Sequence, residues 1–318
     1  MRALAIVSLL FVLALVSVSA YLRLQNSGIG CPNWPACYGQ IGPVAEAAPT
    51  VGSTYERLAL DAQQPMSWAT PVHRLVASVL GLLVLGMALM SLRAGRDRLL
   101  SFTLLGLTVF LAWLGIYSGG LHNPAVVMGN LGGGFAMLGL LGWMVFRDAR
   151  PHANASRRVR RWVVAALVLL CIQIGLGGLT SANFAATACM SIPDCHGTWM
   201  PGGDLAKAFD LTRQHEIGPS GHALGGAERG DIHKLHRLVA IVTLLTALLA
   251  GGLAVLGRMG ATAVFVIVLV ALEFGVGVAA ILADLPIGIA VAHNWLAAIL
   301  LLGLLRLFAL CRNRQALL

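Results

Sequence analysis

The sequence has few charged residues and few cysteines. Only 11% of its 318 residues are charged, whereas an average soluble domain carries about 25%. Together with 58% hydrophobic residues and a mean hydropathy of +0.82, this deficit excludes an ordinary cytosolic enzyme, a disordered chain and a fibrous protein. Basic residues outnumber acidic ones by 22 to 13, but no basic face with interleaved aromatic residues indicates nucleic-acid binding. The six cysteines are too few for a disulfide scaffold, and the composition predicts a polytopic membrane protein.

Eight apolar stretches are long enough to cross a membrane. About 20 apolar residues span a hydrocarbon core of roughly 30 Å, and each span must be helical because lipid offers the backbone no hydrogen-bond partner. The predicted spans are about 4–22, 71–91, 99–118, 124–146, 162–180, 233–256, 262–283 and 287–310. The first stretch, which follows Arg2 and ends at Ala20, also fits a cleaved signal peptide. It is long for that role, and we predict a retained span that contacts membrane lipid.

The distribution of Lys and Arg predicts the orientation. If both termini are cytoplasmic, 14 of the 22 basic residues lie on the inner side, and the short outer connections 119–123 and 284–288 carry none. Cytoplasmic loops of membrane proteins are enriched in basic residues. We therefore expect a multi-pass protein of a bacterial inner membrane, with two long outer loops at 23–70 and 181–232. A homo-oligomer is possible.

Two segments of the chain repeat one cysteine and histidine pattern. Each long outer loop contains two cysteines separated by five residues and ending in Pro-x-Cys-x-Gly, namely Cys31 and Cys37, and Cys189 and Cys195. A helix opening with His-Arg-Leu follows each pair, at 73–75 and 236–238. We therefore predict an all-α membrane protein built from two four-helix bundles, 1–150 and 151–318, related as a parallel repeat.

Three histidines and one asparagine occupy equivalent places in this repeat. His293 follows His236 by 57 residues, and the same step from His73 reaches Asn130. Because an ionisable side chain in a membrane helix normally faces the bundle interior, each position is a candidate site. A single histidine would indicate an interhelical hydrogen bond. Three histidines at related positions favour a cofactor, and haem is the natural one because its iron takes axial imidazoles.

Four further polar residues lie close to these positions or in a span. Arg74 and Arg237 each follow a histidine, where they could pair with haem propionates or anchor the helix at the interface. His233 lies three residues before His236, and we expect it to support the site rather than to bind metal. Glu273 lies near the middle of the seventh span. It could be a neutral hydrogen-bonded group or part of a proton path, and the sequence does not choose.

The cysteine pairs allow three interpretations. Structural or regulatory disulfides come first, because the outer side of a bacterial inner membrane is oxidising. A membrane thiol–disulfide oxidoreductase is a remoter alternative, since neither pair is a Cys-x-x-Cys motif and the membrane histidines would remain unexplained. Metal binding is the third, with His196, His215 and His222 nearby but no zinc-like spacing.

Taken together, these motifs resemble the heme A synthases, integral membrane enzymes of cytochrome oxidase assembly. The resemblance extends over all eight spans. The residues that carry it are 30–39 (GCPNWPACYG), His73-Arg74, 176–183 (LGGLTSAN), 196–201 (HGTWMP), 233–237 (HKLHR) and 292–294 (AHN).

The resemblance implies a function and a set of ligands. Heme A synthases oxidise a ring methyl group of heme O to a formyl group through hydroxylation, which makes heme A for cytochrome c oxidase biogenesis. By resemblance, His236 and His293 hold a haem b in the second half, and His73 with position 130 holds the substrate haem in the first. Heme O synthase and oxidase assembly factors are the implied partners, and the electron donor is unknown.

The sequence departs from the family pattern at two places. Asn130 stands where the family has a histidine, and Thr70 stands where it tends to carry a glutamate of the reaction, three residues before His73. A haem held by His73 alone would have an open face, which suits oxygen chemistry. The alternative is a divergent haem-b-binding assembly or electron-transfer protein that makes no heme A.

Overall fold

The computed structural model describes residues 1–24, 68–117, 124–195, 197–203, 205–212 and 226–312. Eight helices in these ranges are long and apolar enough to cross a membrane, which confirms the predicted number of spans. They are α1 (Arg2–Leu24), α3 (Ala69–Ala94), α4 (Arg98–Tyr117), α5 (Pro124–Phe146), α6 (Arg157–Ala182), α8 (Ala227–Leu256), α9 (Ala261–Leu282) and α10 (Ile287–Leu310). Two short helices, η1 (Ala185–Ala188) and α7 (Leu205–Ala208), lie between α6 and α8. Cys31, Cys37, His196, His215 and His222 lie outside the described residues.

Several helices extend beyond the apolar stretches that predicted them. The α6 helix begins at Arg157 because the Ser156 hydroxyl accepts a hydrogen bond of 3.2 Å from the backbone N–H of Val159, which caps the first turn. The α8 helix begins at Ala227 and carries Glu228 in its first turn, where the helix dipole favours a negative charge. Hydropathy therefore locates the membrane-crossing part of each helix, whereas caps and polar turns set its ends.

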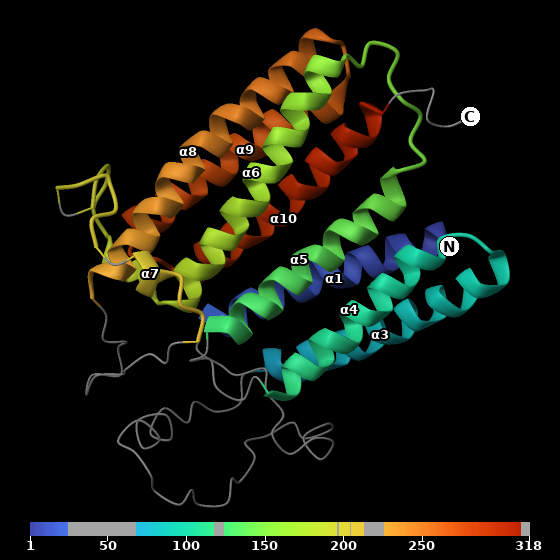
Figure 1. Cartoon of the computed structure of the whole chain (residues 1–318), viewed down its shortest axis with the longest axis horizontal. Helices are drawn as coiled ribbons and strands as arrows, with labels where there is room; N and C mark the ends of the chain where they lie inside the picture. Colours follow the sequence, from blue (N-terminus) through green and yellow to red (C-terminus); the bar gives the residue numbers. More distant parts are fainter. Residues whose placement is uncertain (25–67, 118–123, 196, 204, 213–225, 313–318) are drawn as a thin grey trace, which may run out of the picture.

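The helices form two groups of four. Within the first, α1 contacts α3, α3 contacts α4, α4 contacts α5 and α5 contacts α1. The second closes in the same order through α6, α8, α9 and α10, and the two groups lie side by side (Figure 1). This order of contacts is the one that a repeat of four helices requires. It supports the predicted repeat, which stays a prediction.

The two groups meet through α1, α5, α6 and α10. The α10 helix packs against both α1 and α5, and α5 also packs against α6. Gly142 allows the close approach of α5 and α10, because a Cβ atom there would lie 2.6 Å from a methyl carbon of Leu302. Leu138 and Leu141 on α5 and Leu304 on α10 are fully buried in one hydrophobic cluster. The first group can therefore contribute residues to a site in the second.

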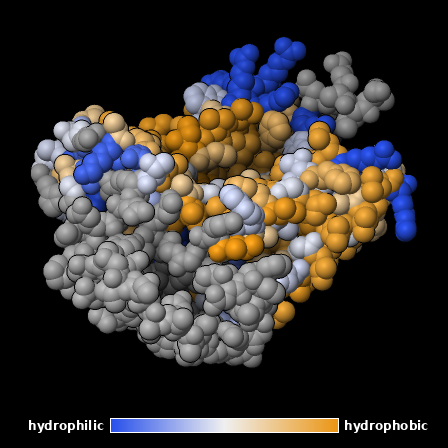
Figure 2. Space-filling model, turned by 60° about the horizontal axis from the view of Figure 1, so that its bottom comes forward, coloured by the Kyte–Doolittle hydropathy of each residue, from blue (hydrophilic) through white to orange (hydrophobic). Residues whose placement is uncertain are grey.

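The outer surface of the helices is apolar. Hydrophobic residues cover the helical surface in Figure 2, and hydrophilic residues gather at its margins. Large exposed side chains such as Leu82, Leu245 and Leu272 are 50% or more exposed. Apolar surface on this scale is unusual for a soluble monomer, and with eight apolar helices it identifies a multi-pass membrane protein.

Candidate functional site

A cavity of about 430 Å³ lies inside the second group of helices. This volume is within the usual range for a ligand pocket, about 300–1,000 Å³. Its walls come from α6, α8, α9 and α10, and from α1 and α5 of the first group. Its polar lining residues include His233, His236, His293, Gln173, Glu273 and Arg23. Two of the histidines predicted as ligands therefore share one cavity.

His236 on α8 and His293 on α10 face each other across this cavity. Their ring centroids are 6.4 Å apart, and the ring planes are nearly perpendicular, at 84°. The residues lie 57 positions apart in the sequence, and the folding of α8 and α10 around one cavity brings them together. The structure therefore places this predicted pair in one site.

A polar side chain from a neighbouring helix contacts each of the two rings. The Gln173 Nε2 atom on α6 lies 3.1 Å from His236 Nδ1 and donates to the His236 carbonyl oxygen, also at 3.1 Å. On α9, Glu273 Oε1 and the Glu273 carbonyl oxygen each lie 3.2 Å from His293 Nδ1. When His293 Nδ1–H donates to these oxygens, its Nε2 lone pair is left to bind a metal. The sequence left the role of Glu273 open. The structure places this residue beside His293, a candidate metal ligand.

A glycine lies against each of the same rings. A Cβ atom at Gly177 would lie 3.2 Å from His236 Cε1, and one at Gly277 would lie 3.0 Å from His293 Cε1. Both distances are shorter than ordinary van der Waals contact. Each imidazole therefore occupies space that only glycine leaves open.

Sequence reasoning missed Gln173, Gly177 and Gly277, although a signal was present. The α6 segment 173–177 reads QIGLG and the α9 segment 273–277 reads EFGVG. In each segment the first residue is polar, although the helix is apolar. The glycine that contacts the histidine ring lies four positions after it. Residues four apart lie on one helix face. This spacing could therefore have indicated two helix segments that each contact a histidine ring.

His233 lines the same cavity but contacts a different element. Its side chain is only 4% exposed, and its ring interacts with the backbone of Ala185 and Ala186 in η1. This contact ties the loop after α6 to α8. It supports the interpretation of His233 as a residue that positions the site, which stays a prediction.

Arg237 holds the loop that contains the second cysteine pair. Cys189 and Cys195 form a disulfide with a Cα–Cα distance of 5.2 Å, so this predicted disulfide is present. The Arg237 guanidinium donates to the carbonyl oxygens of Cys189, Ser191 and Asp194, at 2.7 Å for Ser191 and 3.1 Å for Asp194. The residue next to His236 therefore fixes the disulfide loop, whose Ile192 and Pro193 line the cavity.

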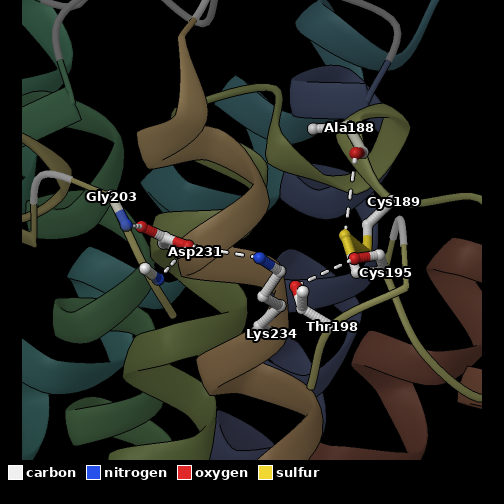
Figure 3. A network of polar contacts seen from close by, with 8 residues as sticks. Ala188, Cys189, Cys195, Thr198, Gly203, Asp231 and Lys234 are labelled. Atoms are coloured by element: carbon white, nitrogen blue, oxygen red, sulfur yellow. Dashed lines mark hydrogen bonds and ion pairs between the residues drawn. A yellow bond between two sulfur atoms is a disulfide. The ribbon is translucent and has the colours of Figure 1, made fainter. Parts of the chain in front are cut away.

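Asp231 fixes the following stretch of the loop to α8. Figure 3 shows its carboxylate between Gly203 and Lys234. The carboxylate accepts hydrogen bonds from the backbone N–H groups of Gly202 and Gly203, at 3.1 and 2.6 Å. The ammonium group of Lys234 lies 3.5 Å away, and the Asp231 side chain is 1% exposed. One buried carboxylate thus neutralises a cation and binds two backbone donors.

Asp231→Ala is expected to destabilise the protein by about 3 kcal/mol, because it leaves a buried cation and two N–H groups without their acceptor. Thermal unfolding in detergent, followed by circular dichroism, measures the loss. Asp148→Ala is the matched control. The Asp148 carboxylate is 60% exposed and lies 3.9 Å from Arg147, so its removal is expected to cost less than about 1 kcal/mol. Equal losses for the two variants would contradict the proposed anchoring role of Asp231.

The candidate residues of the first group are placed on α3 and α5. Thr70 is buried, at 4% exposure, in the first turn of α3, and His73 and Arg74 follow it by three and four positions in that helix. Asn130 lies on α5 and is partly buried. Neither His73 nor Asn130 lines the cavity described above, and their joint role as a haem site stays a prediction.

The two remaining cysteines are unpaired in the structure. Cys171 lies on α6, and Cys311 follows α10. Burial raises the pKa of the Cys311 thiol to about 11. Because the thiolate is the reactive form, Cys311 is unsuited to thiol–disulfide exchange. Within the described ranges, no group of three or more His, Cys, Asp or Glu side chains could hold a metal ion by itself.

The fold and the site define a multi-pass α-helical membrane protein with a histidine pair in an internal cavity. The chain belongs to the cytochrome oxidase assembly protein family COX15-CtaA, whose sequence profile matches residues 2–305. It is 35% identical to the heme A synthase of Shewanella oneidensis over 307 residues, which covers 94% of this chain and 92% of that protein. The heme A synthase of Methylobacterium radiotolerans is 27% identical, covering 90% and 83% of the two chains. These similarities confirm the family that the motifs predicted.

Proposed function

We propose that this protein is a heme A synthase that oxidises the ring methyl group of heme O to a formyl group through hydroxylation. The observation that carries the proposed reaction is the similarity of the chain to heme A synthases, and the His236 and His293 pair across one cavity supports a bound haem. The pair lies in a chain similar over 94% of its length to a heme A synthase. Its place in cytochrome oxidase assembly follows from the family.

The lining of the cavity and its histidine pair support a haem b that would be held by His236 and His293. A metal-bound imidazole nitrogen lies about 2 Å from its metal, so two imidazoles that would both bind one ion would have ring centres within about 6 Å of each other. The observed separation is 6.4 Å. The cavity lining is mainly apolar, from residues such as Leu131, Phe135 and Leu300, as a porphyrin face requires. When bound, the haem would supply redox chemistry.

The protein's own residues would orient the two ligands. Glu273 and the backbone at the same residue fix the His293 ring through Nδ1, and Gln173 contacts the His236 ring from α6. Ring orientation set by such outer partners is a general feature of metal-binding histidines. In the first group, His73 would hold the substrate haem. Asn130 would leave the opposite face open, and the buried Thr70 hydroxyl would stand at the position of the family glutamate.

The orientation proposed from the basic residues agrees with the arrangement of the chain. The start of α1 and the end of α10 lie at the same end of the helices, and the disulfide loop after α6 lies at the other end (Figure 1). A disulfide persists in an oxidising compartment, which supports a periplasmic position for the loop. We therefore propose a bacterial inner-membrane protein with cytoplasmic termini. Heme O synthase, other assembly factors and an electron donor are its proposed partners.

A second candidate function is a haem-b-binding protein of oxidase assembly or electron transfer without synthesis of heme A. The identities of residues 70 and 130, threonine and asparagine, favour it, because both changes fall in the half expected to carry out the oxidation. The His236 and His293 site would be the same in both cases. The product therefore decides between the two.

A pyridine-haemochrome spectrum of the purified protein, co-expressed with a heme O synthase, tests the proposal. Heme A together with haem b is the expected result. Haem b alone, with heme O supplied and unconverted, would establish the second candidate. A protein without any haem would contradict both and would turn attention to the cysteines.

Gly277→Ala is expected to weaken haem b binding about tenfold, because its Cβ atom would lie 3.0 Å from His293 Cε1 and overpacking typically costs about 1–3 kcal/mol. Haem titration of the apoprotein, followed by absorbance, measures the change. Gly275→Ala on the same helix is the matched control, since no atom lies within 4 Å of the added Cβ. A tight haem complex in Gly277→Ala would show that the His293 ring is not held against α9.

A further inference from the structure

Arg23 extends from the first group of helices into the cavity of the second. It lies at the last turn of α1 and lines the cavity together with His236 and His293. Its Nε donates to the Ser181 hydroxyl on α6 at 2.9 Å. One Nη atom lies 3.5 Å from the side-chain oxygen of Asn294 on α10. Because Asn294 follows His293 directly in the chain, the guanidinium lies at the His293 end of the cavity.

The charge of Arg23 has only neutral partners among the described residues. No carboxylate in those ranges lies within the 4.0 Å of an ion pair with its guanidinium. A cation taken out of water is costly unless an opposite charge or several hydrogen bonds compensate it. The guanidinium has five N–H donors, of which Ser181 and Asn294 occupy two. A strong anion-binding group is thus directed at an otherwise mainly apolar cavity.

Arg237, the other arginine of the cavity wall, is differently engaged. Its guanidinium donates to three backbone carbonyl oxygens of the disulfide loop. Those bonds use three of its five N–H donors, whereas the printed bonds of Arg23 use two. Of these two cations, Arg23 therefore has the greater capacity left to bind an anion.

We propose that Arg23 binds a carboxylate group of the porphyrin that occupies the His236 and His293 cavity. Ser181 and Asn294 position the guanidinium, and the carboxylate supplies the missing opposite charge through charge-assisted hydrogen bonds. This inference rests on the proposed haem b site. It makes α1 a part of that site, so the second group of helices binds haem fully only when the first is packed against it.

Titration of the apoprotein with haem and with haem dimethyl ester tests the proposal directly. The ester lacks the carboxylate charges but keeps the ring and the iron. In nanodiscs of phosphatidylcholine, the wild-type protein is expected to bind the ester about tenfold to a hundredfold more weakly, which is the effect of a charged hydrogen bond. Arg23→Gln is expected to lower the affinity for haem by a similar factor and to leave the affinity for the ester unchanged.

Arg306→Gln is the matched control. Arg306 also donates from Nε to a hydroxyl group, that of Thr262 at 3.2 Å, but it is exposed near the other end of α10. This variant is expected to retain the wild-type preference for haem over the ester. Its behaviour separates the loss of a carboxylate contact from the general effect of removing an arginine from the helix surface.

Two results would overturn the proposal. Equal binding of haem and ester by the wild-type protein would exclude a carboxylate contact, and this measurement does not depend on the folding of any variant. Equal binding together with phosphatidylglycerol that co-purifies with the wild type but not with Arg23→Gln would assign Arg23 to a lipid headgroup instead. Failure of the wild type to bind either porphyrin is a different result, because it contradicts the proposed haem site itself.

Discussion

His293→Ala is expected to remove the b-type haem from the purified protein. The imidazole is one of two that face the cavity, and the methyl group of alanine offers the iron no ligand. His236→Ala should have the same effect, since both rings would bind one ion. The double variant should be no worse than either single one, because residues that act as a unit are not additive. Reduced-minus-oxidised absorbance spectra and the haem content per protein measure the loss.

Two further histidine variants serve as controls for this result. His152 lies in the connection between α5 and α6, outside the cavity lining, and His152→Ala should retain the full haem content. His233→Ala should retain haem with reduced affinity, because the residue contacts the η1 backbone rather than the opposite imidazole. Full haem content in His293→Ala would mean that the pair at 6.4 Å is not the iron site.

The membrane-spanning helices could be predicted because the composition of each stretch of sequence determines them without tertiary contacts. Lipid allows only helices with satisfied backbones, so apolar stretches of sufficient length identify them without tertiary information. The helix ends were less predictable. Ser156 and Glu228 extend α6 and α8 into polar sequence, where hydropathy carries no signal and the local capping pattern decides.

Part of the site was predictable because it is repeated in the sequence. The His-Arg-Leu triplets and the common step of 57 residues identified His236 and His293 as related positions. Arg23 carried no such signal. Its two partners, Ser181 and Asn294, follow it by 158 and 271 positions in the sequence. These contacts depend on how α1 packs against α6 and α10. The spacing of apolar and polar residues along one helix does not specify how that helix packs against two others.

The role of Arg237 shows a similar limit. The sequence allowed a propionate contact or an interfacial anchor, and the structure adds a third role, the fixing of a loop through its carbonyl oxygens. That role depends on the path of the chain around the disulfide, which the spacing of Cys189 and Cys195 does not determine. The distinction matters for function, because it moves the expected carboxylate contact from the residue beside His236 to one on α1.

His73→Ala is expected to abolish the formation of heme A while the haem b content stays at the wild-type level. His73 is on α3 in the first group of helices, whereas His236 and His293 line a cavity in the second. Loss of the substrate ligand should therefore leave the haem b ligands in place, and supplied heme O should accumulate unconverted.

Haem extraction and chromatography of membranes co-expressing heme O synthase measure heme O, heme A and haem b together. His236→Ala is the reciprocal variant, since it should lose haem b first. Asn130→His tests the interpretation that a haem held by His73 alone has an open face. If oxidation requires a free coordination position opposite His73, a second imidazole there should lower heme A production rather than raise it. Full heme A production by His73→Ala would show that the substrate site has been assigned to the wrong residue.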